Sequence, residues 1–308
     1  MTQPRTLTDE RTVNWRSVPE VGTMLGLRLV AGTLRLFGRA AAGALLWVVC
    51  WYYLAFSSTA RRASWDFFTR LGQPSTLRHT HRHLWAFARV AADRLLFLTG
   101  DTDDLVVHLH GHEHIMALAA AKKGGLLLGA HLGSFEAMRS LAARYDVPLL
   151  VVADFKNARR INALLEHFSP QLRVRLLELD PENPTGLLAA KEAVDRGELV
   201  AMLADRATHR DERDVSVPFL GGSARLPVGA HVLASVLGCP VFFVCALFEG
   251  PRTYQVHCVP LTDRVLLPRA DRAGALKNEV ERYARVLEDF ARRSPMNWFN
   301  FFPFWVDS

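Results

Sequence analysis

The chain has 308 residues, 50% hydrophobic and 22% charged, which is enough to bury the core of one large domain or two smaller ones. Its mean hydropathy of +0.07 lies far below that of a transporter with many membrane spans. The net charge of +6 favours an anionic partner: a membrane surface, an acidic carrier protein, a phosphate-bearing substrate or nucleic acid. Its four cysteines form no CxxC pair and lie in apolar runs, which predicts small buried side chains without a disulfide framework or zinc site.

The N-terminal part of the chain contains one stretch that suits a bilayer. Residues 40–60 carry no charge, and this length can cross a bilayer as a helix. Arginines flank both ends, and the tryptophans and tyrosines within it suit the headgroup level, so a helix in the membrane plane is an equal alternative. The charged residues before it do not resemble a cleavable signal peptide. We predict a membrane-anchoring helical segment over 1–72 and a catalytic domain, facing the cytoplasm, over 73–308.

After a break at 72–75, helical and apolar segments alternate. A helix is predicted over 77–98, and apolar runs typical of buried strands lie at 126–130, 149–153, 174–179, 199–204 and 241–248, with a further candidate at 253–259. Helical patterns fall between most of these runs, at 134–144, 158–168, 185–196 and 227–237, and a last amphipathic helix near 271–293 precedes an aromatic tail. This alternation predicts an α/β fold with a mixed, largely parallel central sheet flanked by helices.

The strongest candidate for chemistry is His131, at the end of the strand predicted over 126–130. Glu136 lies in the first turn of the next helix, and a tight loop would let its carboxylate accept the proton of one imidazole nitrogen. The other nitrogen would then remove a proton from a substrate hydroxyl or amine, while amides at the helix start stabilise the resulting oxyanion. The alternative is a structural histidine and a glutamate that only complements the helix dipole.

Two aspartates follow their strands as His131 follows its own. A parallel sheet would bring Asp154 and Asp205 to the same edge as His131, where ligands of α/β proteins bind. Basic residues crowd these loops and suit a phosphopantetheine phosphate, an acidic carrier or an anionic headgroup, although solvated loop charges are the alternative for each. We predict that Asp205 orients a basic side chain and that the substrate-binding arginines are Arg159, Arg206 and Arg225.

Two groups of histidines have to be weighed against metal binding. His79 and His83 lie one helical turn apart, and four alternating histidines would share one face of a strand: His108, His110, His112 and His114. Neither group has an HExxH pattern or nearby cysteines, so we expect solvated histidines and no metal. The sequence also lacks a P-loop, a GxGxxG fingerprint and a GxSxG elbow, which weakens kinase, dehydrogenase and serine-hydrolase interpretations.

Four blocks carry a resemblance that covers most of the chain: GGLLLGAHLGSFE, LVAMLADR, VSVPFLGGSARLPVGAHVLASVLGCPVFF and NWFNFFPFW. In them the chain resembles the lipid A biosynthesis acyltransferase family, the lauroyl and myristoyl transferases of the lysophospholipid acyltransferase-like superfamily. The resemblance implies a glycerolphosphate-acyltransferase-like fold, an acyl-carrier-protein or acyl-CoA donor and no metal or other cofactor. It also implies work at the cytoplasmic face of the bacterial inner membrane. It matches His131 and Glu136 to the family's histidine and carboxylate dyad, and Asp205 and Arg206 to a later block.

The chain also departs from that family. Ser134 and Phe135 stand where the family often has Asn-Trp, and the FNFFPFW tail resembles acyltransferases of aryl polyene or related polyketide-lipid pathways. We therefore expect an acyltransferase that moves a fatty acyl group to a hydroxyl or amine of a lipid, with lipid A itself open as the acceptor. A membrane-associated lipid hydrolase and a non-catalytic lipid-binding scaffold of the same fold are the alternatives. We expect no nucleic-acid partner, because the basic residues are dispersed and no recognised module occurs.

Overall fold

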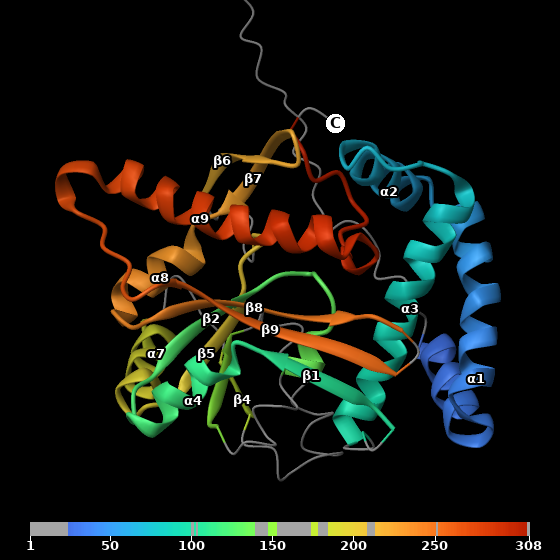
Figure 1. Ribbon diagram of the computed structural model, residues 1–308, viewed down its shortest axis with the longest axis horizontal. Coiled ribbons are helices and arrows are strands. Elements are labelled where there is room, and N and C mark those ends of the chain that lie inside the picture. The colour runs from blue at the N-terminus through green and yellow to red at the C-terminus, as the bar shows by residue number, and fades with distance from the viewer. Residues whose placement is uncertain are drawn as a thin grey trace, which may run out of the picture.

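The computed structural model describes residues 24–99, 102, 104–138, 147–152, 174–177, 184–207, 213–250 and 252–306. Its centre is a seven-stranded sheet of order β1-β9-β8-β2-β5-β3-β4 (Figure 1). The strands are β1 Val106–His110, β2 Gly125–Gly129, β3 Leu149–Val152, β4 Val174–Leu177, β5 Leu199–Leu203, β8 Val241–Phe248 and β9 Thr253–Thr262. Neighbours are parallel except β8 and β9. The predicted mixed, largely parallel sheet is confirmed.

Helices cover the sheet and extend beyond one end of it. They are α1 Met24–Phe56, α2 Ser58–Arg70, α3 Leu77–Thr99, α4 His112–Ala120, α7 Thr185–Asp195, α8 Gly229–Leu237 and α9 Arg272–Arg293. In Figure 1, α9 lies across one side of the sheet, and α1, α2 and α3 form a group at one end of the molecule. A short 3₁₀ turn, η3 Pro295–Asn297, follows α9 and leads into the aromatic tail.

The central strands are apolar on both faces, which is why the sequence shows them as continuous apolar runs. In β2, Leu126 and Leu128 pack into the core shared with α7, α8 and α9, whereas Leu127 packs on the opposite face with Ile115 of α4. Helix α9 closes the first face with apolar residues three or four positions apart, the spacing of an amphipathic helix. Those residues are Val280, Tyr283, Leu287 and Phe290.

Each strand predicted from an apolar run is present, and its ends differ from the predicted ends by no more than three residues. The edge strand β1, helix α4 and a separate antiparallel hairpin were missed; the hairpin consists of β6 Asp214–Phe219 and β7 Gly222–Pro227. The four alternating histidines do not share one strand face. The strand ends at His110, Gly111 adopts a left-handed conformation, and His112 begins α4.

The N-terminal region agrees with the predicted apolar helix in part. Helix α1 is kinked at Gly38, and its segment Leu36–Phe56 is the one helix in the described part of the chain that is long and apolar enough to cross a membrane. It ends four residues before the predicted limit of 60, because Ser57 caps α2 by accepting a hydrogen bond from the amide of Ala60. The predicted boundary at residue 72 falls in the turn before α3 and stays a prediction.

Two of the predicted helices lie partly or wholly outside the described residues. Of the helix predicted over 134–144, residues 135–138 are helical and the rest lies outside the described residues, as does the helix predicted over 158–168. All four cysteines are free and buried, which confirms that they act as small core side chains.

Candidate active site

The carboxyl ends of β2 and β5 bring His131 and Asp205 together. The two strands are parallel neighbours in which Gly129 pairs with Leu203, and each of the two polar residues follows two positions later. His131 Nδ1 lies 3.0 Å from Asp205 Oδ1 and 3.1 Å from Oδ2. The backbone amide of His131 also donates to Asp205 Oδ2 over 3.1 Å. Asp205 therefore holds His131 by both its ring and its backbone amide.

The carboxylate of Asp205 is buried but well supplied with donors. Asn300 Nδ2 donates to its Oδ2 over 3.2 Å, in addition to the two donors of His131. Burial alone would raise the pKa of Asp205, but His131, these hydrogen bonds and the neighbouring charge of Arg206 outweigh it and hold the pKa well below its usual range. Asp205 is therefore ionised at neutral pH and can only accept hydrogen bonds.

The protonation state of the His131 imidazole depends on its burial and on the charges of Arg206 and Asp205. Burial and the charge of Arg206 lower the pKa of His131 below its ordinary value, and Asp205 only partly opposes them. The ring is therefore neutral at pH 7, and its single proton resides on Nδ1, which faces the carboxylate. Nε2 is left with its lone pair, on a side chain that is 33% exposed. This is the arrangement required of a general base.

Arg206 is fixed beside this pair by the C-terminal segment. Its Nε donates to Asn300 Oδ1 over 2.6 Å, a second guanidinium nitrogen donates to the carbonyl of Phe299 over 3.0 Å, and the group lies 4.6 Å from the ring centre of Phe302. Burial lowers the pKa of Arg206 to about 10, so it stays a cation at neutral pH. Asn300 thus links Arg206 to Asp205, and the basic side chain is oriented through an amide rather than by the carboxylate directly.

The loop that follows His131 is held on two sides. The amide of Gly133 donates to the carbonyl of Asn297 and that of Ser134 donates to the carbonyl of Ala246, while the amide of Phe299 donates back to the carbonyl of His131. Gly133 has φ +74°, and a Cβ at this position would lie 2.0 Å from the carbonyl oxygen of Ala246, so only glycine fits. The tight loop that the sequence predicted is present.

Glu136 does not contact the imidazole among the described contacts. It points from the first turn of the helix toward α3, where its Oε2 lies 3.1 Å from Arg94 Nε. The predicted contact between Glu136 and the imidazole is absent because the turn at Gly133 directs Glu136 toward α3. Asp205 is the carboxylate that lies next to Nδ1 of His131. Arg94 is half exposed, and its charge contributes to the lowered pKa of His131, so this ion pair borders the site.

The other predicted residues do not join the pair. Arg225 lies on β7 and forms an ion pair with Asp214 of the same hairpin, 2.9 Å away. Arg159 and Asp154 lie outside the described residues. Among the described residues, no three His, Cys, Asp or Glu side chains meet in a way that could hold a metal ion.

Residues for which the sequence suggested no role beside His131 support the site from behind. Tyr283 of α9 donates its hydroxyl proton to the carbonyl of Gly129, at the end of β2, over 2.8 Å. His83 of α3 lies between Ser64 Oγ and the carbonyl of Trp298. Asn297, Trp298 and Asn300 belong to the aromatic tail, whose asparagines were the available signal: polar side chains within an apolar segment have to find buried partners.

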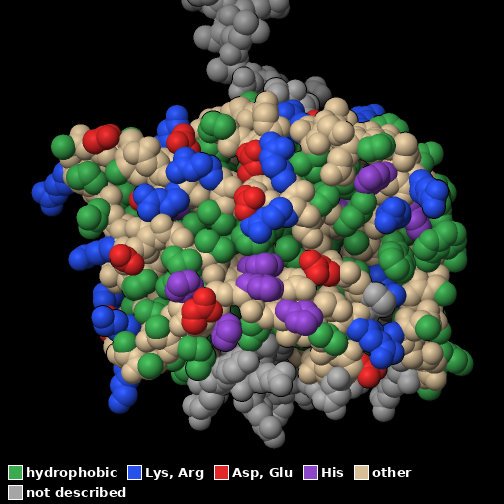
Figure 2. Space-filling model, in the orientation of Figure 1, with side chains coloured by type: hydrophobic (Ala, Val, Ile, Leu, Met, Phe, Trp, Pro, Cys, Tyr) green, Lys and Arg blue, Asp and Glu red, His purple; other side chains and the backbone are tan. Residues whose placement is uncertain are grey.

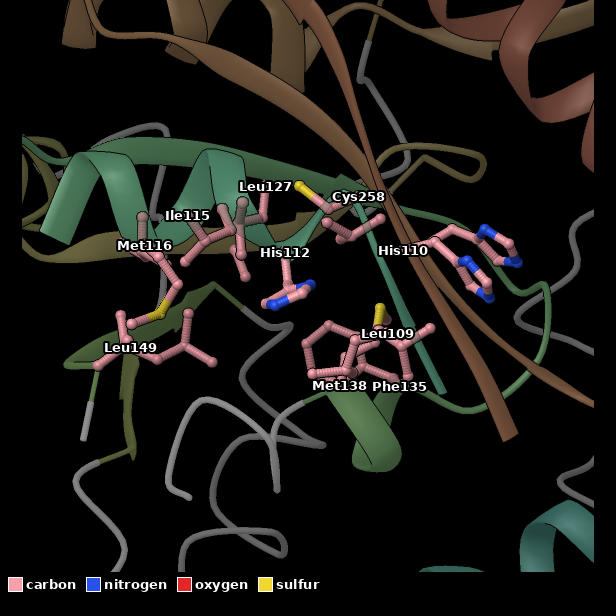
Figure 3. A pocket seen from close by; sticks show the side chains of 16 residues that line it. Leu109, His110, His112, Ile115, Met116, Leu127, Phe135, Met138, Leu149 and Cys258 are labelled. Atoms are coloured by element: carbon pink, nitrogen blue, oxygen red, sulfur yellow. The ribbon is translucent and has the colours of Figure 1, made fainter. Parts of the chain in front are cut away.

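An apolar pocket opens on the face of the sheet opposite α9, shown in Figure 3. Its volume is about 100 Å³. Ile115 and Met116 of α4 line it together with Leu127, while Phe135 and Met138 come from the helix that follows His131. The pocket wall therefore begins four residues after the candidate base along the chain.

Comparison with known proteins places this site within a family. The family model described as bacterial lipid A biosynthesis acyltransferase matches residues 86–306, which include His131, Asp205 and Arg206. No curated protein matches the chain.

Proposed function

Because the chain belongs to the bacterial lipid A biosynthesis acyltransferase family, which implies acyl transfer to a lipid A-type acceptor, we propose that it moves a fatty acyl group from acyl-carrier protein or acyl-CoA to a hydroxyl or amine of a lipid. His131 is the general base, Asp205 orients it, and Arg206 and Arg94 provide positive charge for phosphate groups of donor or acceptor. The observation that carries this proposal is the hydrogen bond between His131 Nδ1 and Asp205, which leaves Nε2 as the basic atom.

The proposed reaction is a direct transfer. Nε2 of His131 takes the proton of the acceptor hydroxyl as its oxygen attacks the carbonyl carbon of the acyl thioester. The tetrahedral intermediate collapses with cleavage of the C–S bond, and the leaving sulfur takes the proton from Nε2 and departs as a thiol, which returns the imidazole to its neutral form. The amides of Gly133, Ser134 and Ala137 already have acceptors, so the donors proposed for the oxyanion are the amides of Phe135 and Glu136.

The apolar pocket supports a fatty acyl group as the transferred moiety. Its lining is almost wholly apolar, and an acyl chain would gain about 0.8 kcal/mol for each CH₂ group that leaves water. Phe135 and Met138 of the pocket wall belong to the helix that follows His131, so the wall is continuous along the chain with the loop of the proposed base.

The proposal is tested by mass spectrometry of total lipids from the native host, with the gene intact, deleted or carrying His131→Ala. We expect one lipid to lose an acyl chain in both altered strains, because transfer without the base falls by about 10²–10⁴-fold. That lipid identifies the acceptor and chain together. Unchanged lipids, with the protein expressed, would contradict transfer and favour a scaffold, whereas accumulation of an over-acylated lipid would favour a hydrolase.

A further inference from the structure

Arg206 is a partly buried cation whose hydrogen-bond partners in the described structure are all neutral. Figure 2 shows Lys and Arg side chains at the surface, several of them beside acidic side chains. Along α9, for example, Arg292 pairs with Glu288. Arg206 instead bonds the amide oxygen of Asn300 and the carbonyl of Phe299. An arginine that follows a buried carboxylate in the sequence and does not pair with it needs a physical reason.

Asp205 would be the natural partner of Arg206. The two residues are adjacent in the sequence, and opposite charges attract strongly where water is scarce, often through two parallel hydrogen bonds. Among the described residues, however, no ion pair joins them, and the carboxylate of Asp205 bonds His131 and Asn300. Each charge acts on the other only at longer range, through its effect on the pKa of the other group.

The side chain of Asn300 lies between the two charges and bonds both. Its Oδ1 accepts from Arg206 Nε over 2.6 Å, and its Nδ2 donates to Asp205 Oδ2 over 3.2 Å. A primary amide offers an acceptor and a donor on one planar group, so it satisfies a cation and an anion at once without a charge of its own. The reverse orientation would set oxygen against the carboxylate and nitrogen against the guanidinium.

The backbone next to Asn300 is held on two sides. The amide of Phe299 donates to the carbonyl of His131, and the carbonyl of Phe299 accepts from Arg206. The ring centre of Phe302 lies 4.6 Å from the guanidinium carbon of Arg206. Asn300 itself is 1% exposed, so water does not compete for its amide. Its side chain therefore has a fixed place between the two charges.

The separation of these charges affects the imidazole of His131. Asp205 raises the pKa of His131, whereas Arg206 and Arg94 lower it. A guanidinium bound directly to Asp205 would neutralise the carboxylate and place a cation closer to a ring that has to accept a proton. The charged and titratable groups around the ring in the described structure are Asp205, Arg206, Arg94, Glu136 and Tyr283.

We propose that Asn300 is a positioning residue, a neutral spacer that keeps the guanidinium of Arg206 off the carboxylate of Asp205. The carboxylate then stays available to the imidazole of His131, and the guanidinium stays available to an anionic group of the substrate. This inference rests on the proposed role of His131 as the base, and its experiments are chosen so that the two can fail separately.

The first experiment compares the pH dependence of kcat/KM in the full-length protein. In Asn300→Ala, Arg206 should move onto Asp205, so the acid limb should shift to lower pH. Transfer at pH 7 should fall by about 10–100-fold, the loss expected for one hydrogen bond to a charged group. In Asn300→Asp, a second carboxylate replaces the donor, so the acid limb should shift to higher pH. An acid limb that stays in place in both variants would overturn the proposal.

The matched control is Asn297→Ala. This asparagine lies three residues earlier in the same tail and is similarly buried, but its amide bonds the backbone of Phe248 instead of charged groups. Its loss should lower transfer and stability without moving the acid limb. The same shift in Asn297→Ala and Asn300→Ala would indicate a general loosening of the tail and would contradict the spacer.

The second experiment removes the cation that the spacer holds back. Arg206→Gln should raise KM for an acyl-CoA donor, which carries phosphates. If Asn300→Ala acts through Arg206, the double variant Asn300→Ala/Arg206→Gln should have a kcat at least about fivefold above that of Asn300→Ala alone. Losses that simply multiply would overturn the proposal, because an asparagine with a purely structural role would not be rescued by the loss of Arg206.

A readout without substrate separates this inference from the proposed function. Diethyl pyrocarbonate modifies neutral imidazole, so its rate of reaction with His131, followed by peptide mass spectrometry from pH 5 to pH 8, reports the pKa of His131. The neutral ring should persist to lower pH in Asn300→Ala than in the wild type. If it does while His131→Ala keeps full transfer, the spacer stands and the proposed base fails. If His131→Ala abolishes transfer and the shift is absent, the base stands and the spacer fails.

Discussion

At His131 the hydrogen bond to Asp205 determines which imidazole nitrogen accepts a proton. An ionised carboxylate can only accept, so Nδ1 carries the proton and Nε2 is the atom that we propose as the base. The lowered pKa of His131 keeps the ring neutral, so the proposed general base is active above this pKa and is lost as the pH falls through it. We therefore expect kcat/KM to fall only below about pH 6.5, the ordinary value for histidine.

Replacing Asp205 with asparagine tests this pairing. The variant removes the charge that raises the pKa of His131, so the acid limb of the pH profile should move to lower pH. Transfer should drop by about 10²–10⁴-fold, because an amide can hold the wrong tautomer of the ring. Glu136→Gln is the matched change at the carboxylate that pairs with Arg94, and it should cost less than about tenfold. The measurement is kcat/KM from pH 5 to pH 9, and a larger loss in Glu136→Gln would return the orienting role to that residue.

The sequence was informative about His131 and much less so about its partner. The strand, loop and helix around His131 are local features, and the apolar run that ends there predicts where the imidazole stands. The carboxylate that meets it lies 74 residues away, and this contact depends on β2 and β5 being neighbours in the sheet. Glu136 is near in sequence, but the turn at Gly133 directs it elsewhere. A local pattern cannot choose between two carboxylates when strand order decides which one is adjacent.

At the scale of the elements, α3 and the aromatic tail support the loop of the site through His83. Its ring is fully buried, with Ser64 Oγ on Nδ1 at 3.0 Å and the carbonyl of Trp298 on Nε2. A carbonyl only accepts, so Nε2 carries the proton and Nδ1 accepts from the hydroxyl. Trp298 pairs with Leu132 in an isolated bridge, beside the candidate base. A neutral His83 therefore connects α2 and α3 to the residues around His131.

His83 should make folding stability sensitive to acid. Burial lowers its pKa to about 3, whereas the unfolded chain takes up the proton near pH 6.5. The stability is thus complete above pH 6.5 and falls as the pH drops toward 3, by up to about 1.4 kcal/mol per pH unit. His83→Gln should lower stability at pH 7 by roughly 1–3 kcal/mol and flatten this slope. Ser64→Ala should lower stability and keep the slope. Urea unfolding between pH 4 and pH 8 checks both, and an unchanged slope in His83→Gln would contradict the assignment.

The elements that the sequence predicted are those whose apolar pattern is complete. The interior strands β2, β5 and β8 are buried on both faces, so nothing interrupts their apolar runs. The edge strand β1 alternates exposed and partly buried residues, and two of its five residues are histidines. The hairpin of β6 and β7 has no continuous apolar run, and Ala224 of β7 forms a bridge with Trp305, which is distant in sequence.

At the scale of the whole molecule, helix α2 shares one hydrophobic core with the central sheet. The sequence predicted an anchoring segment over 1–72, yet Phe67 and Phe68 of α2 are fully buried members of the main core cluster. Phe67 stacks on Trp298 with ring centres 5.6 Å apart, and Trp298 adjoins the residue that bonds the carbonyl of His131. Residues 58–72 therefore contribute to the same hydrophobic core as the strands, and we expect them to unfold together with the sheet.

The variant Phe67→Ala tests whether α2 unfolds together with the sheet. Removing this fully buried phenylalanine should lower the free energy of unfolding by about 3–5 kcal/mol, because the surrounding residues relax only partly into the cavity left beside Trp298. Phe87→Ala removes the same side chain from a position on α3 that is 38% exposed, and it should cost less than about 1.5 kcal/mol. Urea unfolding of the full chain in detergent, followed by tryptophan fluorescence and by far-UV circular dichroism, should give one coincident transition for both variants. Two separated transitions, with Phe67→Ala shifting only the first, would show that the first 72 residues fold as a unit distinct from the sheet.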